Sequence, residues 1–511
     1  MRLWVTAVML MLGISLSAET LWVAQSPAGL DDGTSVENAR GVAWLNTATN
    51  WSDGTGFVTP GDTVMLSGTI VSNIVIAGSG SNGSPVTIQF SSGARMQSGS
   101  WGTGGAISAS GKHWINIDGA GFGVIEATNN GTGLAFTNND RFVAISGCNG
   151  WSVQNIAMEN MFQRTGGDGD ANAFGTALYA LNCSSLTLSN CVINQGAKVV
   201  LIAYSAGNSN VVIANNRITN CVVGITIGSG GTGATLANAD VYGNRIKMGT
   251  NWSGCWQIST PCDAWHHVDG VHVYAVHTSS VLSNCRIFGN NIGGDNSWST
   301  AGTGVSTAWI YIEASAGSIP SPWVFNNVLF VDDGSSYGPA VGIIDLKGIA
   351  SPVVANNTIV GNGIRNGIYL ESTTTNATVQ NNIIQDVTLA IYDNEIDATI
   401  ATDYNDIYGC DSIGRIRNTT YNSISDWRTG LGGCPNAGNE CSSIVDDPQL
   451  TSFVPVYGSP AIGTGTDLSL YFTTDFTGST RIAPWDIGAY EYLGRRATAN
   501  TVNVGTLVIA P

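Results

Sequence analysis

Apolar and polar residues alternate in short runs along the middle of the chain, and the runs end in Asn, Cys or Gly. A recurrent unit has an apolar residue, an Asn or Cys two or three positions later, and another apolar residue, as in residues 213–218 (IANNRI). The marker positions are Cys191, Asn216, Asn244, Cys285, Asn327, Asn357, Asn382 and Asn405. Their steps of 23 to 42 residues are typical of stacked repeats. The alternation and the turn residues predict coils of short strands rather than helix pairs.

One such coil cannot bury its apolar face alone and needs neighbours above and below. Stacked coils pair as parallel strands about 4.8 Å apart, so equivalent Asn side chains lie over one another. We therefore expect a ladder of hydrogen-bonded amides inside one turn. Cys191 and Cys285 stand at marker positions, which predicts small buried thiols there.

These repeats resemble the right-handed parallel β-helix superfamily, which includes pectate-lyase-like and chondroitinase-B-like polysaccharide enzymes. The resemblance covers roughly residues 55–430, and residues 60–66 (PGDTVML) are similar to the opening of many members. It implies an all-β solenoid with capped ends. Segments 447–449, 458–462 and 486–491 (DIGAYE) resemble the tail of bacterial choice-of-anchor β-helix proteins. That tail implies a lineage and not a reaction.

The chain divides into five predicted segments. Residues 1–18 are typical of a secretory signal, with Arg2 before an apolar run and small residues at its end. Residues 19–145 are predicted as an N-terminal cap with irregular first coils, and 146–409 as regular coils. Residues 410–492 are predicted as C-terminal coils and a cap, and 493–511 as an extension or linker. No later stretch is long and apolar enough to span a membrane.

The composition limits the classes of molecule that the protein is expected to bind. Charged residues make up 11% of the chain, against about 25% in ordinary domains. The formal net charge of −17 argues against nucleic acid as a partner. It also disfavours a polyanionic glycan unless calcium bridges the carboxylates, and Asp332 and Asp333 are the candidate calcium ligands. The sequence therefore predicts an exported or cell-surface protein, expected to be a monomer, with a polysaccharide as partner.

The ten cysteines permit disulfides in an exported chain. The local pairs Cys255 with Cys262 and Cys434 with Cys441 are the predicted bridges. Five others are predicted to be buried and free: Cys148, Cys183, Cys191, Cys221 and Cys285. Cys410 is left unassigned.

Long insertions mark one edge of the predicted solenoid. The strands Val271-His-Val273, Ile310-Tyr-Ile312 and Ile344-Asp-Leu346 follow their markers by 27, 25 and 17 residues, against 9 and 11 in flanking coils. Insertions on one edge usually mark a binding face.

Side chains alternate across a strand, so the neighbours of these apolar residues should point outward in two columns. One column is His272, Tyr311, Asp345 and Tyr369, and the other is Tyr274, Glu313, Lys347 and Glu371. Asp269 precedes the first strand, and the insertions contribute Trp256, Trp265 and Trp298. Aromatic rings with carboxylates and amides suit a sugar chain. The candidate catalytic residues are Asp269, His272, Glu313, Asp345 and Lys347, and the candidate substrate-binding residues are Tyr274, Tyr311, Tyr369, Glu371, Trp256, Trp265 and Trp298.

Two reactions fit this pattern. Glu313 and Asp345, with backbones roughly 8 Å apart, suit inverting glycoside hydrolysis, in which Asp269 could replace either. Alternatively, Lys347 or His272 would take a proton beside a uronate, and Tyr311 or Tyr274 would protonate the leaving oxygen. Neither hydrolase nor lyase catalytic motifs are present, so these roles rest on geometry.

Structural explanations remain open beside the functional ones. A loop Trp could simply hold its loop against the sheet. Glu313, Lys347 and Glu371 could form an ordinary ion-pair ladder between coils. The alternative function is a non-catalytic surface or adhesion protein that binds glycans.

Overall fold

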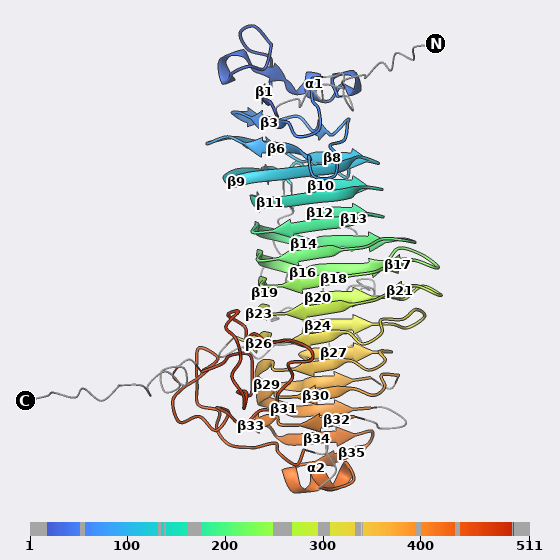
Figure 1. Ribbon diagram of the computed structural model, residues 1–511, viewed down its shortest axis with the longest axis vertical. Coiled ribbons are helices and arrows are strands. Elements are labelled where there is room, and N and C mark those ends of the chain that lie inside the picture. The colour runs from blue at the N-terminus through green and yellow to red at the C-terminus, as the bar shows by residue number, and fades with distance from the viewer. Residues whose placement is uncertain are drawn as a thin grey trace, which may run out of the picture.

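The protein is a right-handed parallel β-helix, a tall stack of coils (Figure 1). The computed structural model describes residues 18–51, 57–130, 134–136, 139–161, 175–248, 268–294, 307–332, 339, 341–371, 373–394, 400–434, 440–492 and 494. Nearly all of the predicted signal and of the predicted C-terminal extension lie outside these residues, and so does the Cys255–Cys262 pair.

Each coil contributes strands to three faces of the stack, because the chain turns between short strands. The first face contains β1 (Thr20–Ala24), β3 (Thr63–Leu66), β6 (Val86–Phe90), β13 (Ser184–Ser189), β15 (Val211–Ala214), β18 (Ala239–Tyr242), β22 (Cys285–Phe288), β25 (Trp323–Phe325), β28 (Val353–Ala355), β30 (Thr378–Gln380) and β32 (Ala401–Asp403). The second contains β4 (Thr69–Ile70), β7 (Arg95–Ser98), β19 (Arg245–Met248), β23 (Asn291–Gly294), β26 (Val328–Val331) and β33 (Asp406–Tyr408). The third contains β5 (Ile74–Val75), β8 (Ile107–Ser110), β10 (Arg141–Ser146), β12 (Thr176–Leu181), β20 (Val268–Tyr274), β24 (Thr307–Glu313), β27 (Ile344–Lys347) and β34 (Ser412–Ile416).

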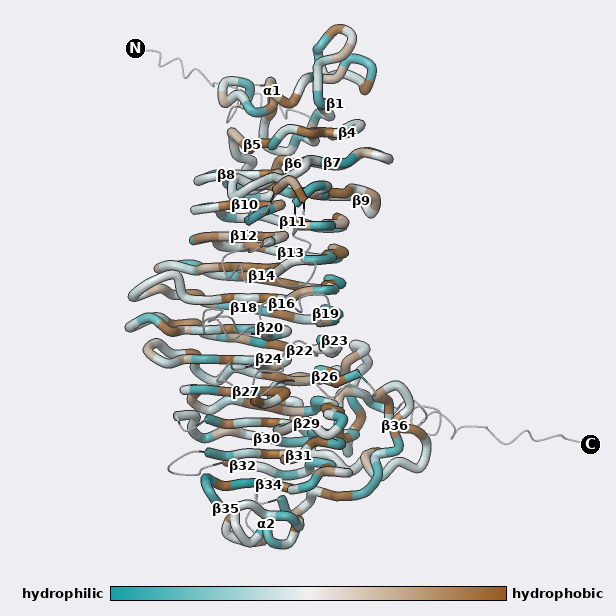
Figure 2. Tube along the Cα trace, turned by 180° about the vertical axis from the view of Figure 1, so that it is seen from behind, coloured by the Kyte–Doolittle hydropathy of each residue, from teal (hydrophilic) through white to brown (hydrophobic). Residues whose placement is uncertain are grey.

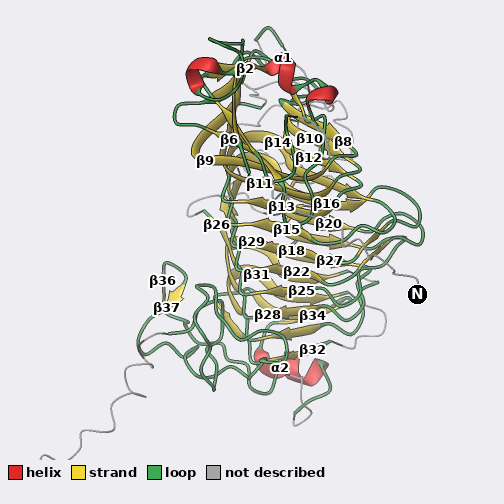
Figure 3. Cartoon of the chain, turned by 45° about the horizontal axis from the view of Figure 1, so that its top comes forward, coloured by secondary structure: helices red, strands yellow, loops and turns green. Residues whose placement is uncertain are grey.

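Long strands bend from one face into the next. β9 (His113–Ala127) and β11 (Asn149–Glu159) join the first face to the second, and β14 (Val192–Tyr204), β16 (Arg217–Ser229), β29 (Thr358–Leu370) and β31 (Ile383–Asp393) join the second to the third. Short elements occupy the ends and loops: β2 (Arg40–Gly41), α1 (Val42–Leu45), β17 (Thr235–Leu236), β21 (Val281–Leu282), β35 (Thr419–Tyr421), α2 (Ile424–Gly430), β36 (Leu450–Thr451) and β37 (Val454–Pro455). Helices lie at both ends of the stack (Figure 3).

The core is one continuous column of inward-facing Ile, Val and Leu side chains. In Figure 2 the apolar and polar positions alternate along the coils, as the sequence pattern predicts. The last part of the chain packs on the lower coils, where it is the red segment beside β26, β29 and β33 in Figure 1. Phe472 stacks on Phe325 with ring centroids 4.3 Å apart, and Ile487 packs with Ile383.

The predicted amide ladder is confirmed at the turn from the first face to the second. In Asn357, for example, the backbone and side-chain N–H groups both donate to Asn382 Oδ1, at 3.0 Å. The residue before each rung has a positive φ, as at Asn356 (50°) and Gly289 (60°). Such a backbone favours Asn or Gly, which explains the paired residues of the motif.

One rung was predicted wrongly. Asn290, and not Cys285, accepts from Asn244 and donates to Asn327 Oδ1. Cys285 instead begins β22, where it pairs with Ala239. The turns before and after the first face both place a residue with positive φ directly before a buried residue. The two turns therefore have similar sequences, and the sequence pattern predicts the rung at the turn before β22 instead of the turn after it. The insertion between rung and third face is therefore 20 residues in this coil, from Asn290 to Ile310.

The cysteine predictions agree with the structure where it describes them. Cys434 and Cys441 form a disulfide. The five thiols predicted as buried and free are both, and Cys410 is free and partly buried. Among the described residues, no helix is long and apolar enough to cross a membrane.

Candidate active site

The candidate site lies on the third face, where β16, β20, β24, β27 and β29 follow one another down the stack. The register puts Thr226, His272, Tyr311, Asp345 and Tyr369 in one column, as predicted from His272 onward, but all of these except Tyr369 are buried. Tyr274, Glu313 and Lys347 form the column beside it, and Glu371 continues it directly after β29. The structure therefore stacks residues from Thr226 to Glu371, which are 145 positions apart in the sequence. The part of the two columns from His272 to Glu371 is the part that strand alternation predicts.

A bend at Gly270 adds a third column. Val271 faces the core, and Gly270 does so too, because a Cβ at Gly270 would lie 2.5 Å from the buried Ile292 Cγ2. Two consecutive residues that face the core interrupt the alternation of the strand. The bend turns Asp269 to the same side as His272, three residues later. Ile225 pairs with Val271, so Val223 is the position one coil above Asp269. Val223 pairs in turn with Lys198, which is therefore the equivalent position two coils above Asp269.

Asp269 and His272 form a carboxylate–imidazole couple. His272 Nδ1 lies 3.6 Å from Asp269 Oδ2, and Asp269 Oδ1 accepts a hydrogen bond from the Ala308 N–H at 3.0 Å. Asp269 is fully buried, and His272 retains 8% of its surface. Burial raises the pKa of Asp269 well above its ordinary value, and nearby Asp345 raises it further, whereas the Ala308 N–H opposes the shift.

Aromatic contacts fix the plane of the imidazole. The Tyr311 ring stacks on the His272 ring from the next coil, at 4.8 Å between centroids and an interplanar angle of 29°. The Tyr274 ring, on the same strand, lies 5.0 Å from the His272 ring and leans over Gly228, where a Cβ would clash with it. Burial raises the pKa of Tyr274, and Glu313 adds to the shift, so this phenol holds its proton.

A pocket of about 450 Å³ opens beside the couple. Its lining residues are Lys198, Val223, Thr226, His272, Tyr274, Val276, His277, Glu313 and Ser315. The volume falls within the range of small-molecule sites. Burial lowers the pKa of Lys198, and Asp269 opposes that shift.

The remaining predicted residues lie in the same columns, at different depths. Tyr311 and Asp345 are buried and do not line the pocket. Lys347 Nζ pairs with Glu313 Oε1 at 3.3 Å. Burial lowers the pKa of Lys347, but Glu313 and Glu371 outweigh it and raise the pKa overall. Burial raises the pKa of Glu371, which Lys347 opposes.

The lower end of the face carries stacked tyrosines. The Tyr369 ring lies 4.7 Å from the Tyr392 ring at an angle of 20°, and the Arg415 guanidinium lies over Tyr392 at 4.9 Å. Asn394 Nδ2 donates to the Tyr369 hydroxyl at 3.4 Å. Burial raises the pKa of Tyr369 to about 12.

Several predicted residues cannot be placed. Trp256, Trp265, Trp298 and Asp333 lie outside the described residues. Asp332 follows β26, and its carboxylate pairs with Lys247 Nζ at 3.3 Å. Within the described residues, no three His, Cys, Asp or Glu side chains are grouped to hold a metal ion.

Sequence reasoning missed Lys198, Thr226, His277 and Ser315. Two coils above His272 and Tyr274, the predicted columns reach Leu201 and Ala203, and not Lys198. Lys198 belongs to the column of Asp269, which the bend at Gly270 creates and which strand alternation does not predict. His277 Nδ1 contacts Ser229 Oγ at 2.9 Å, a contact that the strand pattern does not reveal.

Comparison with known proteins gives likeness in fold. No protein-family profile and no curated protein sequence matches the chain. Among solved structures, it is similar to pectate lyase Pel9A at 14% identity, over 93% of this chain and 97% of that one, with a TM-score of 0.42. The surface protein and adhesin PfbA of Streptococcus pneumoniae matches at 14% identity, over 73% and 94%, with a TM-score of 0.42. DFA-IIIase from Arthrobacter chlorophenolicus A6 matches at 10% identity, over 76% and 94%, with a TM-score of 0.40.

Proposed function

We propose that the protein is an exported enzyme that cleaves a polysaccharide on the third face, by β-elimination beside a uronate. The observation that carries the proposal is the couple of Asp269 and His272, with His272 lining a polar pocket. A shielded acid that orients an imidazole is a common arrangement for proton transfer. The columns of tyrosines and polar side chains on either side suit an extended sugar chain.

The depth of the carboxylates favours elimination over hydrolysis. A hydrolase of the inverting type needs two carboxyl groups on either side of the glycosidic bond. Asp269 and Asp345 are buried, and Glu313 is the one acidic side chain among the pocket's lining residues. Glu313 is also engaged by Lys347. The imidazole and a phenol, by contrast, both reach the pocket.

The proton movements balance within the pocket. In the reactive form Asp269 is ionised, and His272 takes the proton beside the uronate carboxylate at Nε2. The electron pair of that C–H bond forms the double bond as the glycosidic oxygen leaves. Tyr274 gives its proton to the leaving oxygen, and the imidazolium then restores the phenol. Lys198 supplies the positive charge that offsets the uronate.

The test is product analysis on a panel of uronate-containing and neutral polysaccharides. New reducing ends together with ultraviolet absorbance of unsaturated uronate support the proposal. Reducing ends without that absorbance indicate a hydrolase, and retention without either product indicates an adhesion protein; each result overturns the elimination. His272→Ala should lower the rate at least about 10²-fold. His113→Ala, on the first face far up the stack, is the matched control.

A further inference from the structure

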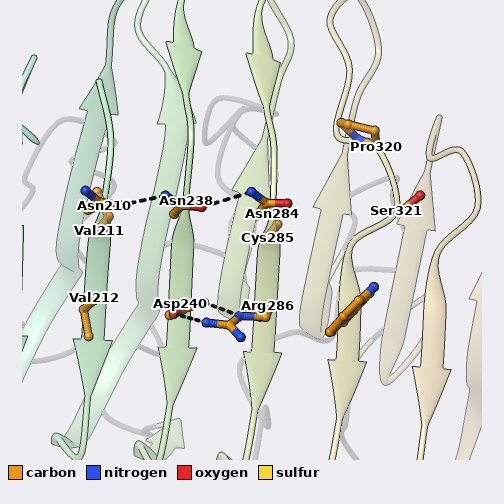
Figure 4. Close-up of a pocket in the computed structure, with 11 residues that line it drawn as sticks. Asn210, Val211, Val212, Asn238, Asp240, Asn284, Cys285, Arg286, Pro320 and Ser321 are labelled. Carbon is orange, nitrogen blue, oxygen red and sulfur yellow. Dashed lines mark hydrogen bonds and ion pairs between the residues drawn. The ribbon is translucent and has the colours of Figure 1, made fainter. Parts of the chain in front are cut away.

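A second pocket lies on the first face, away from the candidate active site (Figure 4). Its volume is about 540 Å³. It spans β15, β18, β22 and β25, and its lining residues are Asn210, Val211, Val212, Asn238, Asp240, Asn284, Cys285, Arg286, Pro320, Ser321 and Trp323. The C-terminal segment reaches the pocket's edge, where Tyr471 meets Trp323.

Three amides form a row along the rim. Asn238 Nδ2 donates to Asn210 Oδ1 at 2.6 Å, and Asn284 Nδ2 donates to Asn238 Oδ1 at 3.0 Å. Figure 4 shows these amides in line, one from each coil. Unlike the interior ladder, this row lies at the surface, with Asn210 and Asn284 exposed and Asn238 partly exposed. Asn284 Nδ2 also donates to Ala237 O at 3.4 Å, and Asn210 Nδ2 is a further amide donor at the surface.

The floor of the pocket carries a closed ion pair. Arg286 Nε and Nη2 donate to the two carboxylate oxygens of Asp240, at 2.7 and 2.5 Å. The hydrogen bonds that Arg286 donates to Asp240 raise the pKa of Arg286, which burial opposes. Since the two charges offset each other, the pocket presents hydrogen-bonding groups without a net charge. Such a lining favours neutral ligands over acidic or basic ones.

An aromatic surface completes the pocket. Trp323 lies directly below Arg286 in the strand register and is partly exposed. The edge-on contact with Tyr471, at 5.3 Å and 90°, holds the indole in place. The next outward row continues as stacked rings, with Tyr242 on Phe288 at 4.9 Å and Phe288 on Phe325 at 4.8 Å.

We infer that this pocket binds a neutral oligosaccharide chain that runs along the stack. The Trp323 ring offers a flat apolar surface for the C–H face of a sugar, and the amide row offers partners for its hydroxyl groups at each coil. Arg286 retains Nη1 donors beyond the pair with Asp240. This binding site does not depend on cleavage at the third face. It adds to the proposed function a second site, at which a glycan chain is bound.

The experiment uses the full protein with the His272→Ala substitution, so that no chain is cut. Retention in native gels cast with single neutral polysaccharides (xylan, glucomannan, mixed-linkage β-glucan) identifies the glycan, and titration with its oligosaccharides gives the affinity. Trp323→Ala should weaken binding about tenfold or more, which is the loss of one aromatic contact of ~1.4 kcal/mol. Arg286→Ala should weaken it less.

Two controls separate the site from general effects. Trp44→Ala removes a similarly half-buried indole at the N-terminal end and should leave retention unchanged. Melting curves show that each variant is folded. The inference is overturned if no neutral glycan retards the protein, or if Trp323→Ala and Arg286→Ala bind as tightly as the parent. Product release by the unmodified enzyme is a separate measurement, so the two proposals fail independently.

Discussion

Two columns of polar side chains run through the same stack, and they differ in composition. In the turn between the first and second faces, Asn repeats coil after coil, and each amide meets the next through equivalent hydrogen bonds. On the third face, the column through His272 changes residue type at every coil, from Thr226 to Tyr311 and Asp345.

The difference separates architecture from chemistry. Amides repeated at the strand spacing satisfy one another's hydrogen bonds, so the same residue at every coil stabilises the stack. A column whose members differ cannot form a self-consistent ladder, and its groups perturb one another instead. Burial raises the pKa of Asp269 and of Tyr274, and Asp345 adds to the first shift and Glu313 to the second. Perturbed groups beside a pocket are the usual mark of a functional site.

After His272→Ala, the largest effect should come from Asp269→Asn. We expect kcat to fall at least about tenfold, because the amide orients His272 without the charge that stabilises the imidazolium. In the parent enzyme the reactive couple requires ionised Asp269, whose pKa is raised, so the rate should increase as the pH rises. The variant lacks that titration, so the limb of the pH–rate profile that belongs to Asp269 should be absent from it.

The pH–rate profile distinguishes a role of Asp269 in positioning His272 from a purely structural role. If Asp269→Asn lowers the melting temperature and leaves the profile in place, Asp269 only supports the fold. Asp345→Asn is the companion variant, since Asp345 is buried one column away and does not line the pocket. It should shift the same limb to lower pH with a smaller loss in kcat.

The next effect contrasts a ladder rung with its neighbour in sequence. Asn405 is fully hydrogen-bonded, whereas the adjacent Asp406 is buried with neither carboxylate oxygen in a hydrogen bond. Asp406 lies beside Ile383, where the C-terminal segment packs. Burial raises its pKa from 3.8 to about 8, and Asp446 and Asp447 add to the shift.

The sign of the pH dependence follows. The folded state holds a proton that the unfolded state releases at lower pH, so this contribution is complete below about pH 4 and is lost as the pH rises through 8. Asp406→Asn should therefore raise the free energy of unfolding at pH 8, by on the order of a few kcal/mol, and leave it unchanged at pH 4. Asp411→Asn, at an exposed position nearby, is the control. Equal stability of parent and variant at both pH values would contradict this account.

Within the ladder itself, Asn357→Ala should lower the free energy of unfolding by about 1–3 kcal/mol, because buried partners lose their hydrogen bonds. Asn327 N and Nδ2 both donate to Asn357 Oδ1, and Asn357 Nδ2 donates to Val324 O. Asn238→Ala removes an amide from the exposed row and should cost much less, since water replaces the lost partners. Denaturant titrations of both variants measure the difference, and equal costs would refute the distinction between the two rows.

Most of the fold was predictable because a solenoid repeats the same local rules. Alternating apolar residues and the Asn turns fix the strands and the ladder, and seven of the eight markers are rungs. Cys285 failed because two turns per coil share the same backbone requirement, so residue type alone does not tell them apart. The hydrogen bonds of Asn290 decide the question, and they depend on stacking.

The sequence predicts which site residues share a column, but not how deeply each of them is buried. Strand alternation places His272, Tyr311 and Asp345 together, yet it does not tell which of them opens on a pocket. The bend at Gly270 also departs from alternation, and it brings Asp269 to His272. Lys198 enters from 74 residues away, through register alone.

The smallest expected effect tests where the ladder stops. Cys191 is its upper end: the Cys191 N–H donates to Asn216 Oδ1, but the thiol lies 3.9 Å from Val153 O, where the other rungs place an amide. Cys191→Asn should add one rung, with Nδ2 donating to Val153 O and Oδ1 accepting from the Ile156 N–H. We expect a gain of about 1 kcal/mol in the free energy of unfolding, the net value of one added hydrogen bond. Cys221→Asn, at an equally buried thiol that contacts Met248 Sδ at 3.7 Å, has no such partners and should destabilise the protein. A loss of stability in both variants would show that the ladder ends at Cys191 because the space above it fits only a thiol.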